Sequence, residues 1–448
     1  MKNLKSLDFC FFFIILISIF LKIFYLNIQY ITWDELLNLN SYFYKEALFL
    51  RNYPNNHFFT SFIGIVVEFF VGTNLTILRA SHFIFFLLLV FLTHITFKNK
   101  LFLYLLVFIY LLSDVLFVYS FLLRGYYISA FFFCIIFFQF VKNKDNPKLI
   151  NLNLIFFICA MQLINNISSL YLVAPIIFAI FFNFKFFSFR KKIFKFILNF
   201  LFFFISIGSI QILLTGLYLE NIPNTYEKIT SILYSNNIGN ILEFLSYLKN
   251  IFFDLYQNGI KTIYFSSHTN VNPASDLRNN LPIFLNQIKS NITIFSIFFI
   301  SLIILVIRAI KNKLNIFDYT ILYFFIFFIL LNRNPSMRIY IPFTYYFMFY
   351  IFYNIKSINV KFKFLNYLIL ILSLLIVLFE KNIYRKEPPL IKQQIKIYKY
   401  LRCDLNNQIF EKEDTKTEFD FIERQMLYYL YLEKCKKKRN IKEYIKFF

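Results

Sequence analysis

Charged residues are scarce in this 448-residue chain: Asp, Glu, Lys and Arg together make up 16% of it, and hydrophobic residues make up 59%. Soluble domains carry about 25% charged residues. Apolar runs of roughly 17 to 25 residues, the length that an α-helix needs to cross a bilayer, recur along most of the chain. A soluble enzyme, a secreted scaffold and a disordered chain are therefore excluded, and we expect an all-α polytopic membrane protein.

The sequence also lacks the short motifs of several common activities. It contains no Walker A, GxGxxG, HExxH or GxSxG motif, so a nucleotide-driven pump or a serine hydrolase finds no support. Its five cysteines, at positions 10, 134, 159, 403 and 435, form no CxxC motif or paired spacing and indicate neither a zinc site nor a disulfide framework. No internal repeat of the kind that marks many transporters is present.

The apolar runs predict about eleven membrane spans. The first run follows Lys2 and Lys5 as in a signal peptide, but it is long and has no small-residue cleavage site, so we expect a retained span. The predicted spans are 9–28, 75–97, 101–119, 125–141, 150–165, 169–184, 193–215, 291–310, 316–332, 339–354 and 363–380.

The net charge of +23 is explained by the short loops between these runs. The stretch 57–70 is apolar, but it has only 14 residues and contains Glu68. If it is a helix on the outer leaflet rather than a span, the lysine-rich short loops all face one side, which the positive-inside rule makes cytoplasmic. Nucleic-acid binding is then the weaker interpretation of the charge. These loop residues are Lys98, Lys100, Lys142, Lys144, Lys148, Lys185, Arg190, Lys191, Lys192, Arg308, Lys311, Lys313, Lys356, Lys361 and Lys363.

This map gives a cytoplasmic N-terminus in an inner, cytoplasmic-type membrane, for which the endoplasmic reticulum is the eukaryotic equivalent. A membrane module then occupies residues 1–380, with outer regions at 29–74 and 216–290. A small soluble region, 381–448, follows on the extracytoplasmic side.

Two acidic positions are candidates for chemistry. Asp34 and Glu35 follow the first span at the outer boundary, where adjacent carboxylates can act as a general base and its electrostatic partner. The alternative is a solvated loop anchored by Trp33. Asp114 lies inside the third predicted span, where an ionisable residue is a functional candidate unless it pairs with an arginine such as Arg79 or Arg124.

Basic and polar residues gather on the same predicted outer side. Arg79, Arg124 and Arg338 lie at outer ends of spans and can hold a phosphate by forked hydrogen bonds, or merely contact lipid headgroups. Asn56 and His57 open the short apolar segment, where His57 can contact a phosphate or an acceptor, or be structural.

The order of these features resembles the GT-C class of membrane glycosyltransferases, in the branch of protein O-mannosyltransferases and lipid A aminoarabinose transferases. In that branch an acidic motif follows the first span, then come a juxtamembrane Asn-His segment, a Leu-Arg-x-Ser element, an Arg-x-Tyr element and a late arginine. The matching segments are Asp34-Glu35, Pro54-Asn55-Asn56-His57-Phe58, Leu78-Arg79-Ala80-Ser81, Arg124-Gly125-Tyr126 and Arg338-Ile339-Tyr340-Ile341-Pro342. One departure is Asn165-Asn166, because the family commonly has a His near this point.

The resemblance implies a GT-C-like fold and the transfer of a sugar from a polyprenyl-phosphate carrier to a lipid, glycan or protein acceptor on the outer face. Asp34 would be the general base and Glu35 would orient it or the substrate. Asn56, His57, Asp114, Tyr126 and Tyr340 would line the substrate site together with the three arginines. No cofactor is implied, and metal use stays open.

Three other functions remain open on the sequence. A glycan polymerase or ligase of the O-antigen kind would depend on residues of the long outer loop such as His268 and Arg278. A lipid-linked saccharide transporter or flippase would need polar residues near the bilayer midplane, often with broken helices. A purely structural scaffold would leave Asp114 and the outer arginines without a role.

Overall fold

The computed structural model describes residues 2–25, 35, 58–71, 74–97, 99–143, 151–166, 169–182, 198, 201–203, 205–206, 281–330, 337–355, 363–380 and 435. This part of the chain contains helices and no strand, which confirms the all-α prediction. Its helices are α1 (Lys2–Tyr25), α4 (Phe58–Val71), α5 (Leu75–Phe97), α6 (Lys100–Leu112), α7 (Asp114–Phe121), α8 (Tyr126–Lys142), α9 (Leu152–Asn165), α10 (Leu170–Phe182), α15 (Leu281–Ile310), α16 (Ile316–Leu330), the 3₁₀ helix η5 (Met337–Tyr340), α17 (Ile341–Ile355) and α18 (Lys363–Glu380).

Two of the described helices are long and apolar enough to cross a membrane: Leu75–Phe97 and the Thr293–Ile310 part of α15. The pair α6 and α7 adds a third if it is counted as one bent span. Shorter apolar helical segments, with 10–17 residues, are Phe13–Phe24, Tyr126–Lys142, Leu152–Leu163, Leu170–Phe182 and Ile316–Phe327. The starts and ends of most helices agree with the predicted spans to within a few residues.

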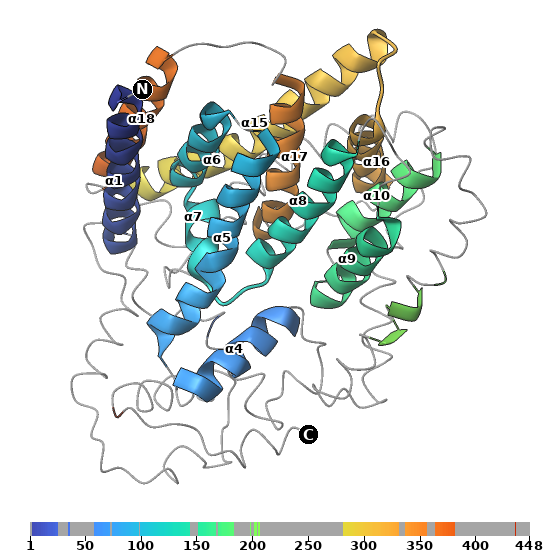
Figure 1. Ribbon diagram of the computed structural model, residues 1–448, viewed down its shortest axis with the longest axis horizontal. Coiled ribbons are helices and arrows are strands. Elements are labelled where there is room, and N and C mark those ends of the chain that lie inside the picture. Colours follow the sequence, from blue (N-terminus) through green and yellow to red (C-terminus); the bar gives the residue numbers. More distant parts are fainter. Residues whose placement is uncertain are drawn as a thin grey trace.

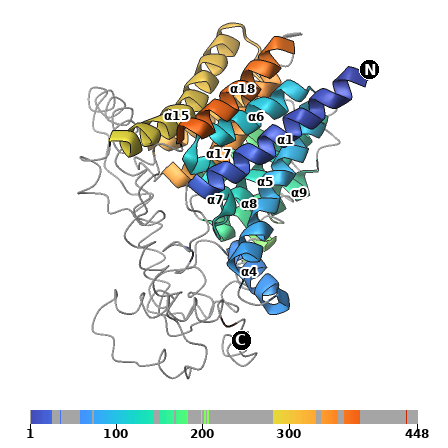
Figure 2. The same ribbon diagram turned by 90° about the vertical axis from the view of Figure 1, so that its left-hand side faces the viewer.

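Most helices run side by side as a bundle, and α4 lies across one end of it (Figures 1 and 2). The predicted 57–70 segment is thus a separate 14-residue helix, which packs against α5 and α9. We call this end of the molecule the α4 end. The N-terminus lies at the opposite end, where α6 begins, α8 ends and the α15–α16 turn is found.

The core is built around α8, which packs against α5 on one side and α17 on the other. The buried Tyr127 hydroxyl of α8 donates to the Leu116 carbonyl (2.5 Å) and meets the Tyr345 hydroxyl of α17 (2.7 Å). On α5, the Phe86 ring stacks on Tyr110 with centroids 3.8 Å apart. Because the phenol oxygens of Tyr127 and Tyr345 have partners, these two side chains fill the core without leaving their own polar atoms unsatisfied.

The outer surface of the bundle is rich in large apolar side chains. Phe20, Phe91 and Leu375 are 69%, 60% and 54% exposed. Contiguous exposed apolar surface of this kind is rare on soluble monomers and fits contact with lipid.

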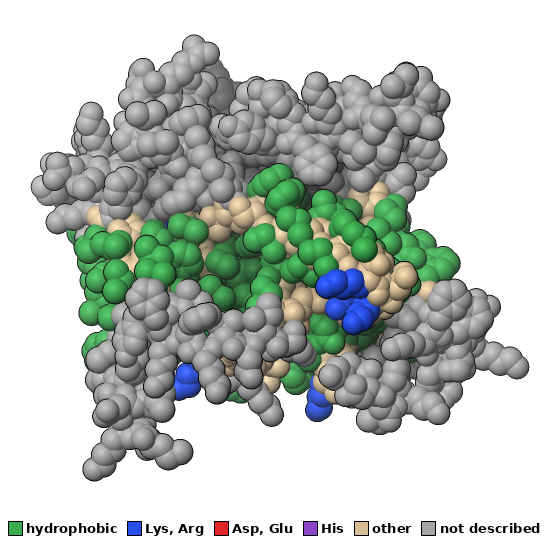
Figure 3. Space-filling model, turned by 90° about the horizontal axis from the view of Figure 1, so that it is seen from above, with side chains coloured by type: hydrophobic (Ala, Val, Ile, Leu, Met, Phe, Trp, Pro, Cys, Tyr) green, Lys and Arg blue, Asp and Glu red, His purple; other side chains and the backbone are tan. Residues whose placement is uncertain are grey.

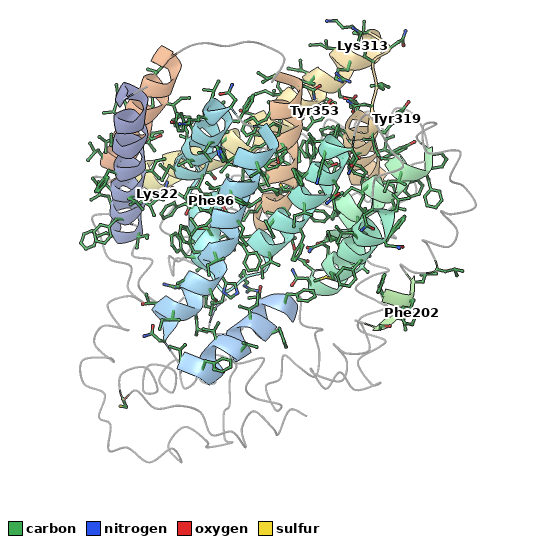
Figure 4. The ribbon with its side chains drawn as sticks, in the orientation of Figure 1. Lys22, Phe86, Phe202, Lys313, Tyr319 and Tyr353 are labelled. Atoms are coloured by element: carbon green, nitrogen blue, oxygen red, sulfur yellow. The ribbon has the colours of Figure 1, made fainter. Side chains whose placement is uncertain are left out.

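The end opposite α4 carries basic side chains, which include the exposed Lys100, Lys142, Lys311 and Lys313, and we call it the basic end (Figures 3 and 4). Its α15–α16 turn is closed by a charged clamp. Arg308 Nε donates to both carboxylate oxygens of Asp318 at 2.9 Å, and the Tyr350 hydroxyl donates to Asp318 Oδ1 at 2.6 Å. The clamp therefore joins α15, α16 and α17 at this end.

The predicted span 101–119 is not one continuous helix, because the chain bends by 91° between α6 and α7. Ser113 separates the two helices in an extended conformation (φ −103°, ψ 114°), and its hydroxyl accepts a hydrogen bond from Leu116 N (3.4 Å). Serine competes with the helix for backbone hydrogen bonds in this way, and it caps the new helix that starts at Asp114.

The bend is held by a buried ion pair. Lys22 of α1 lies on the side that faces the bundle (Figure 4), and its ammonium is 2.7 Å from Asp114 Oδ1. The same ammonium donates to the Leu111 carbonyl at 2.5 Å and lies 5.3 Å from the centroid of the Phe117 ring. The end of a helix leaves carbonyls without intrahelical partners. The break therefore offers the Lys22 ammonium both the free Leu111 carbonyl and the Asp114 carboxylate.

Other predicted boundaries also change. The helix predicted at 291–310 begins at Leu281, so part of the predicted outer loop 216–290 is helical. Pro282 at its second position is compatible with a helix start, where no amide donor is needed. Most of the predicted span 193–215, residues 216–280 and all of the 381–448 region except Cys435 lie outside the described residues.

The cysteine spacing gave no reason to expect a disulfide, yet Cys435 is disulfide-bonded. Cys134 and Cys159 are free and buried in the bundle. A single bridge leaves no spacing pattern in the sequence, so its pairing depends on the fold.

We predict that Lys22→Met lowers the free energy of unfolding by about 3–5 kcal/mol, because it leaves the Asp114 carboxylate buried without its cation. The double variant Lys22→Met/Asp114→Asn should recover most of that loss. Unfolding by SDS in mixed micelles measures both, with Lys100→Met at an exposed position as the control. An additive effect of the two substitutions would contradict the pairing.

Candidate functional site

The α4 end of the bundle contains a buried ion pair between two of the predicted site residues. Arg79 Nε donates to Glu35 Oε1 at 2.7 Å, and Arg79 Nη2 donates to Glu35 Oε2 at 2.5 Å. Glu35 is 0% and Arg79 5% exposed. This two-point geometry is the strongest form of a charge-assisted hydrogen bond and fixes the orientation of both side chains.

Arg79 reaches this position because α5 begins just before it. The Asn74 side chain accepts a hydrogen bond from Ile77 N (3.2 Å) and caps the first turn of the helix. Arg79 then lies on the buried face next to Leu78. The segment after α1 is thereby tied to the start of α5 through Glu35.

One turn further along α5, His82 is buried beside this pair. Its Nδ1 lies 3.0 Å from the Leu78 carbonyl and 3.2 Å from Ser81 Oγ. Glu35 is close enough to act electrostatically on the imidazole, and the backbone of Thr60 in α4 faces the ring. Within the described part of the chain, His82 Nε2 has no hydrogen-bond partner.

Asn165, the last residue of α9, connects α4 to the bundle. Its Oδ1 accepts a hydrogen bond from Phe59 N (3.1 Å), in the first turn of α4, where amides lack intrahelical partners. Its Nδ2 donates to Ser129 Oγ (3.2 Å) and to the Gly125 carbonyl (3.4 Å). This asparagine stands where the resemblance led to the expectation of a histidine, and it has a clear structural role.

Gly125 allows this close approach. A Cβ at this position would lie 2.7 Å from Asn165 Nδ2 and 3.1 Å from Thr60 Oγ1. Its φ of −72° is open to any residue, so the glycine is required by space and not by backbone conformation.

The other predicted site residues have different outcomes. Arg124 is half-buried in the turn before α8, and the buried Tyr126 packs edge-on against Tyr119. Tyr340 is buried in η5, with its ring edge-on to Phe298. Asp34, Asn56 and His57 lie outside the described residues, and of Glu68 and Arg338 only the backbone is described.

Asp114 has a partner other than the ones considered. The expected structural partners were Arg79 and Arg124, whereas the structure pairs Asp114 with Lys22 and pairs Arg79 with Glu35. Of the predicted residues, Glu35 and Arg79 are therefore in direct contact, and Asp114 belongs to the separate pair at the α6–α7 break.

Two important residues were missed by the sequence analysis. His82 and Lys22 are ionisable residues inside predicted apolar spans, and that position alone marks a residue as a functional candidate. His82 also follows Arg79 by three residues, which puts both on one face of a helix.

Among the described residues no group of three or more His, Cys, Asp and Glu side chains could hold a metal ion, and metal use stays open. Comparisons with protein-family models, with curated proteins and with solved structures gave no match for this chain.

We predict that Gly125→Ala destabilises the protein by about 1–3 kcal/mol, because the new methyl group overpacks the contact between Asn165 and Thr60. Gly64→Ala in α4 is the matched control, since a Cβ there meets nothing within 4 Å. Alanine should be neutral or up to about 1 kcal/mol stabilising at Gly64. Equal thermal stability of the two variants would show that the close approach at Gly125 is absent.

We also predict that Glu35→Gln and Arg79→Gln each destabilise the protein by about 3 kcal/mol, because either change leaves a buried charge unpaired. The double variant should be more stable than the sum of the single effects by about 1–3 kcal/mol. A double-mutant cycle of SDS unfolding measures this coupling, with the exposed Lys313→Gln as the control. A coupling near zero would mean that the two side chains do not interact.

Proposed function

We propose that this protein is an integral-membrane glycosyltransferase, which transfers a sugar from a polyprenyl-phosphate donor to a lipid, glycan or protein acceptor on the extracytoplasmic face. The proposal extends the resemblance to the GT-C class, and includes that fold, the eleven spans and a location in the inner membrane of the cell envelope.

The observation that carries the proposal is the fork between Glu35 and Arg79. It joins the acidic motif after the first span to the Leu-Arg-x-Ser element at the start of α5. Both lie at the end of the bundle that α4 crosses, which is the location expected of a juxtamembrane helix over a membrane-embedded site. These elements are distant in the sequence, and the resemblance requires them to meet.

The proposed reaction is a direct displacement. Asp34 takes the proton of the acceptor hydroxyl, and the oxygen attacks the anomeric carbon of the sugar. The bond from that carbon to the phosphate oxygen breaks, and polyprenyl phosphate departs with the electron pair, so the anomeric configuration inverts. A lipid-linked donor also accounts for a site built at the membrane boundary, because the donor cannot leave the bilayer.

The ion pair divides the roles of the charged residues. Each carboxylate oxygen of Glu35 accepts a hydrogen bond from Arg79, so Glu35 suits an orienting role and the base is the adjacent Asp34. The charge of Arg79 is balanced by Glu35 in turn. Arg124 and Arg338, which precede α8 and α17 in the chain, then stabilise the negative charge that develops on the departing phosphate.

Two features support the proposed orientation. The basic end lies opposite the α4 end, as expected if the lysine-rich loops are cytoplasmic. Cys435 of the C-terminal region is disulfide-bonded, and disulfides persist in oxidising, extracytoplasmic compartments.

One observation favours a second candidate function, transport of a lipid-linked saccharide. Transporters often use broken helices with charged residues inside the membrane, and the α6–α7 break with its Lys22–Asp114 pair has this form. A polymerase or ligase would instead depend on residues 216–290, most of which lie outside the described residues.

We expect Asp34→Asn to lower turnover by about 100-fold or more, because a general base typically contributes a factor of 10² to 10⁴. The assay uses protein in nanodiscs with undecaprenyl-phosphate-linked mannose, glucose or aminoarabinose, and measures release of undecaprenyl phosphate. Binding of undecaprenyl phosphate and thermal stability should be unchanged.

Asp254→Asn, a carboxylate of the predicted outer loop, is the control and should retain full turnover. Wild-type turnover in Asp34→Asn would refute the assigned base. If no donor is turned over, but liposomes exchange the lipid-linked sugar and Lys22→Met/Asp114→Asn abolishes that exchange, the transport function is correct instead.

A further inference from the structure

Two buried polar atoms at the contact between α4 and α5 have no hydrogen-bond partner within the described part of the chain. They are His82 Nε2 and Thr60 Oγ1, and their side chains are 2% and 1% exposed. Most buried polar groups in proteins are satisfied, so each exception calls for a bound molecule or another reason.

The two atoms belong to one small region. The Thr60 backbone faces the His82 ring, and Thr60 Oγ1 lies 3.1 Å from the point where a Cβ of Gly125 would be. Glu35 also acts electrostatically on the His82 ring. His82 is thus close to the Glu35–Arg79 fork, and Thr60 is close to the Asn165 contacts with α4.

Only one nitrogen of His82 makes a well-formed hydrogen bond with the described residues. Nδ1 contacts the Leu78 carbonyl one turn back, which orients the ring on α5. Nε2 makes no hydrogen bond of good geometry among the described residues, and on the α4 side the ring meets only the Thr60 backbone. A group that is positioned but unsatisfied is typical of a ligand-binding atom.

The chemistry of the two atoms selects a hydroxyl group as ligand. A hydroxyl both donates and accepts, so it can satisfy Nε2 in either tautomer and can bond to Thr60 Oγ1 at the same time. The nearby charges of Glu35 and Arg79 are paired with each other. An uncharged ligand group therefore fits here without leaving a buried net charge, whereas the phosphate diester of the donor would add a negative charge.

We propose that His82 and Thr60 form a hydroxyl-binding subsite, which holds a hydroxyl of the transferred sugar or the hydroxyl of the acceptor. This inference rests on the proposed function and assigns its substrate contacts to residues outside the motifs of the resemblance. On α9, one turn from Asn165, the amide of the fully buried Gln162 also has no hydrogen-bond partner among the described residues.

The experiment measures separately how much the sugar and the lipid phosphate contribute to the affinity for the donor. Dissociation constants are measured in nanodiscs for undecaprenyl-phosphate-linked mannose, glucose and aminoarabinose, and for undecaprenyl phosphate alone. For the sugar that binds best, the dissociation constant of undecaprenyl phosphate is divided by that of the sugar-linked lipid. This ratio is the contribution of the sugar to binding. The full-length protein is used throughout, and no turnover is needed.

Paired variants separate ligand binding from folding. His82→Asn keeps a group near the position of Nδ1, and so the contact with Leu78, but removes the distal nitrogen, while His82→Gln keeps a polar group at the distal position. Thr60→Val removes the hydroxyl at constant shape, while Thr60→Ser keeps it. Thr93→Val is the matched control, because the buried Thr93 hydroxyl donates to the Leu89 carbonyl, two to three turns further along α5.

We expect His82→Asn and Thr60→Val each to reduce the contribution of the sugar about tenfold, with undecaprenyl phosphate bound as in the wild type. His82→Gln, Thr60→Ser and Thr93→Val should stay within twofold of the wild type. If the sugar contributes nothing in the wild type, the subsite belongs to the acceptor. The same two variants must then weaken binding of a Ser/Thr peptide or of lipid A about tenfold in the presence of saturating undecaprenyl phosphate.

Unchanged binding of both donor and acceptor probes in His82→Asn and Thr60→Val would overturn the subsite, and would mean that the two atoms hold water only. This failure is distinct from a failure of the glycosyltransferase proposal, which depends on the turnover of Asp34→Asn. The subsite stands if sugar binding depends on His82 and Thr60 in a protein that does not turn over any donor.

Discussion

A guanidinium buried at the end of an apolar bundle must have a carboxylate beside it, and the fork between Arg79 and Glu35 meets this requirement. An unpaired charge at such a position costs several kcal/mol. The segment that supplies the partner is therefore fixed beside the guanidinium. Here the partner follows α1, and the pairing brings the segment after the first helix to the start of α5. His82, Thr60 and the contacts of α4 are arranged around this pair.

The need to pair buried charges also explains ion pairs in the middle of the bundle and at its basic end. Lys22 and Asp114 pair inside the bundle, where the break at Ser113 gives the ammonium a carbonyl and a carboxylate. Arg308 and Asp318 pair at the basic end, where Tyr350 adds a third helix to the contact. Within the described residues, these three ion pairs and polar contacts such as Tyr127–Tyr345 tie together helices whose apolar side chains pack without strong preference for one register. Directional bonds between charges supply that preference.

Buried polar atoms without partners among the described residues occur in several places, and two of them lie together at the α4 end. Asn165 uses both ends of its amide to hold α4 against α8 and α9, and Gly125 leaves room for the contact. His82 and Thr60 lie in the same layer with polar atoms unused by the described residues. A region whose framework is tightly bonded, but which keeps a few oriented polar atoms free of partners within the described fold, suits the binding of a substrate hydroxyl.

Hydrophobic patterning was enough to predict most of the helices, because a chain in lipid must satisfy its backbone inside each segment and so forms helices over its apolar runs. It predicted α5 at its exact bounds and identified 57–70 as a separate short helix. It failed at Ser113, because a single polar residue in an apolar run does not reveal whether the helix continues or breaks. That depends on Lys22, a residue 91 positions earlier in the chain, reaching the break.

The sequence by itself therefore determined the class of fold, the approximate helix bounds, the separation of basic loops from acidic motifs and the identity of Glu35 and Arg79 as residues of interest. Only the tertiary structure decided which charges pair, since the sequence offered Arg79 or Arg124 as possible partners of Asp114 and the structure pairs it with Lys22. It also decided that His82 and Thr60 face each other across α4 and α5. Patterning records whether a residue is buried, whereas pairing depends on distances between helices that are far apart in the sequence.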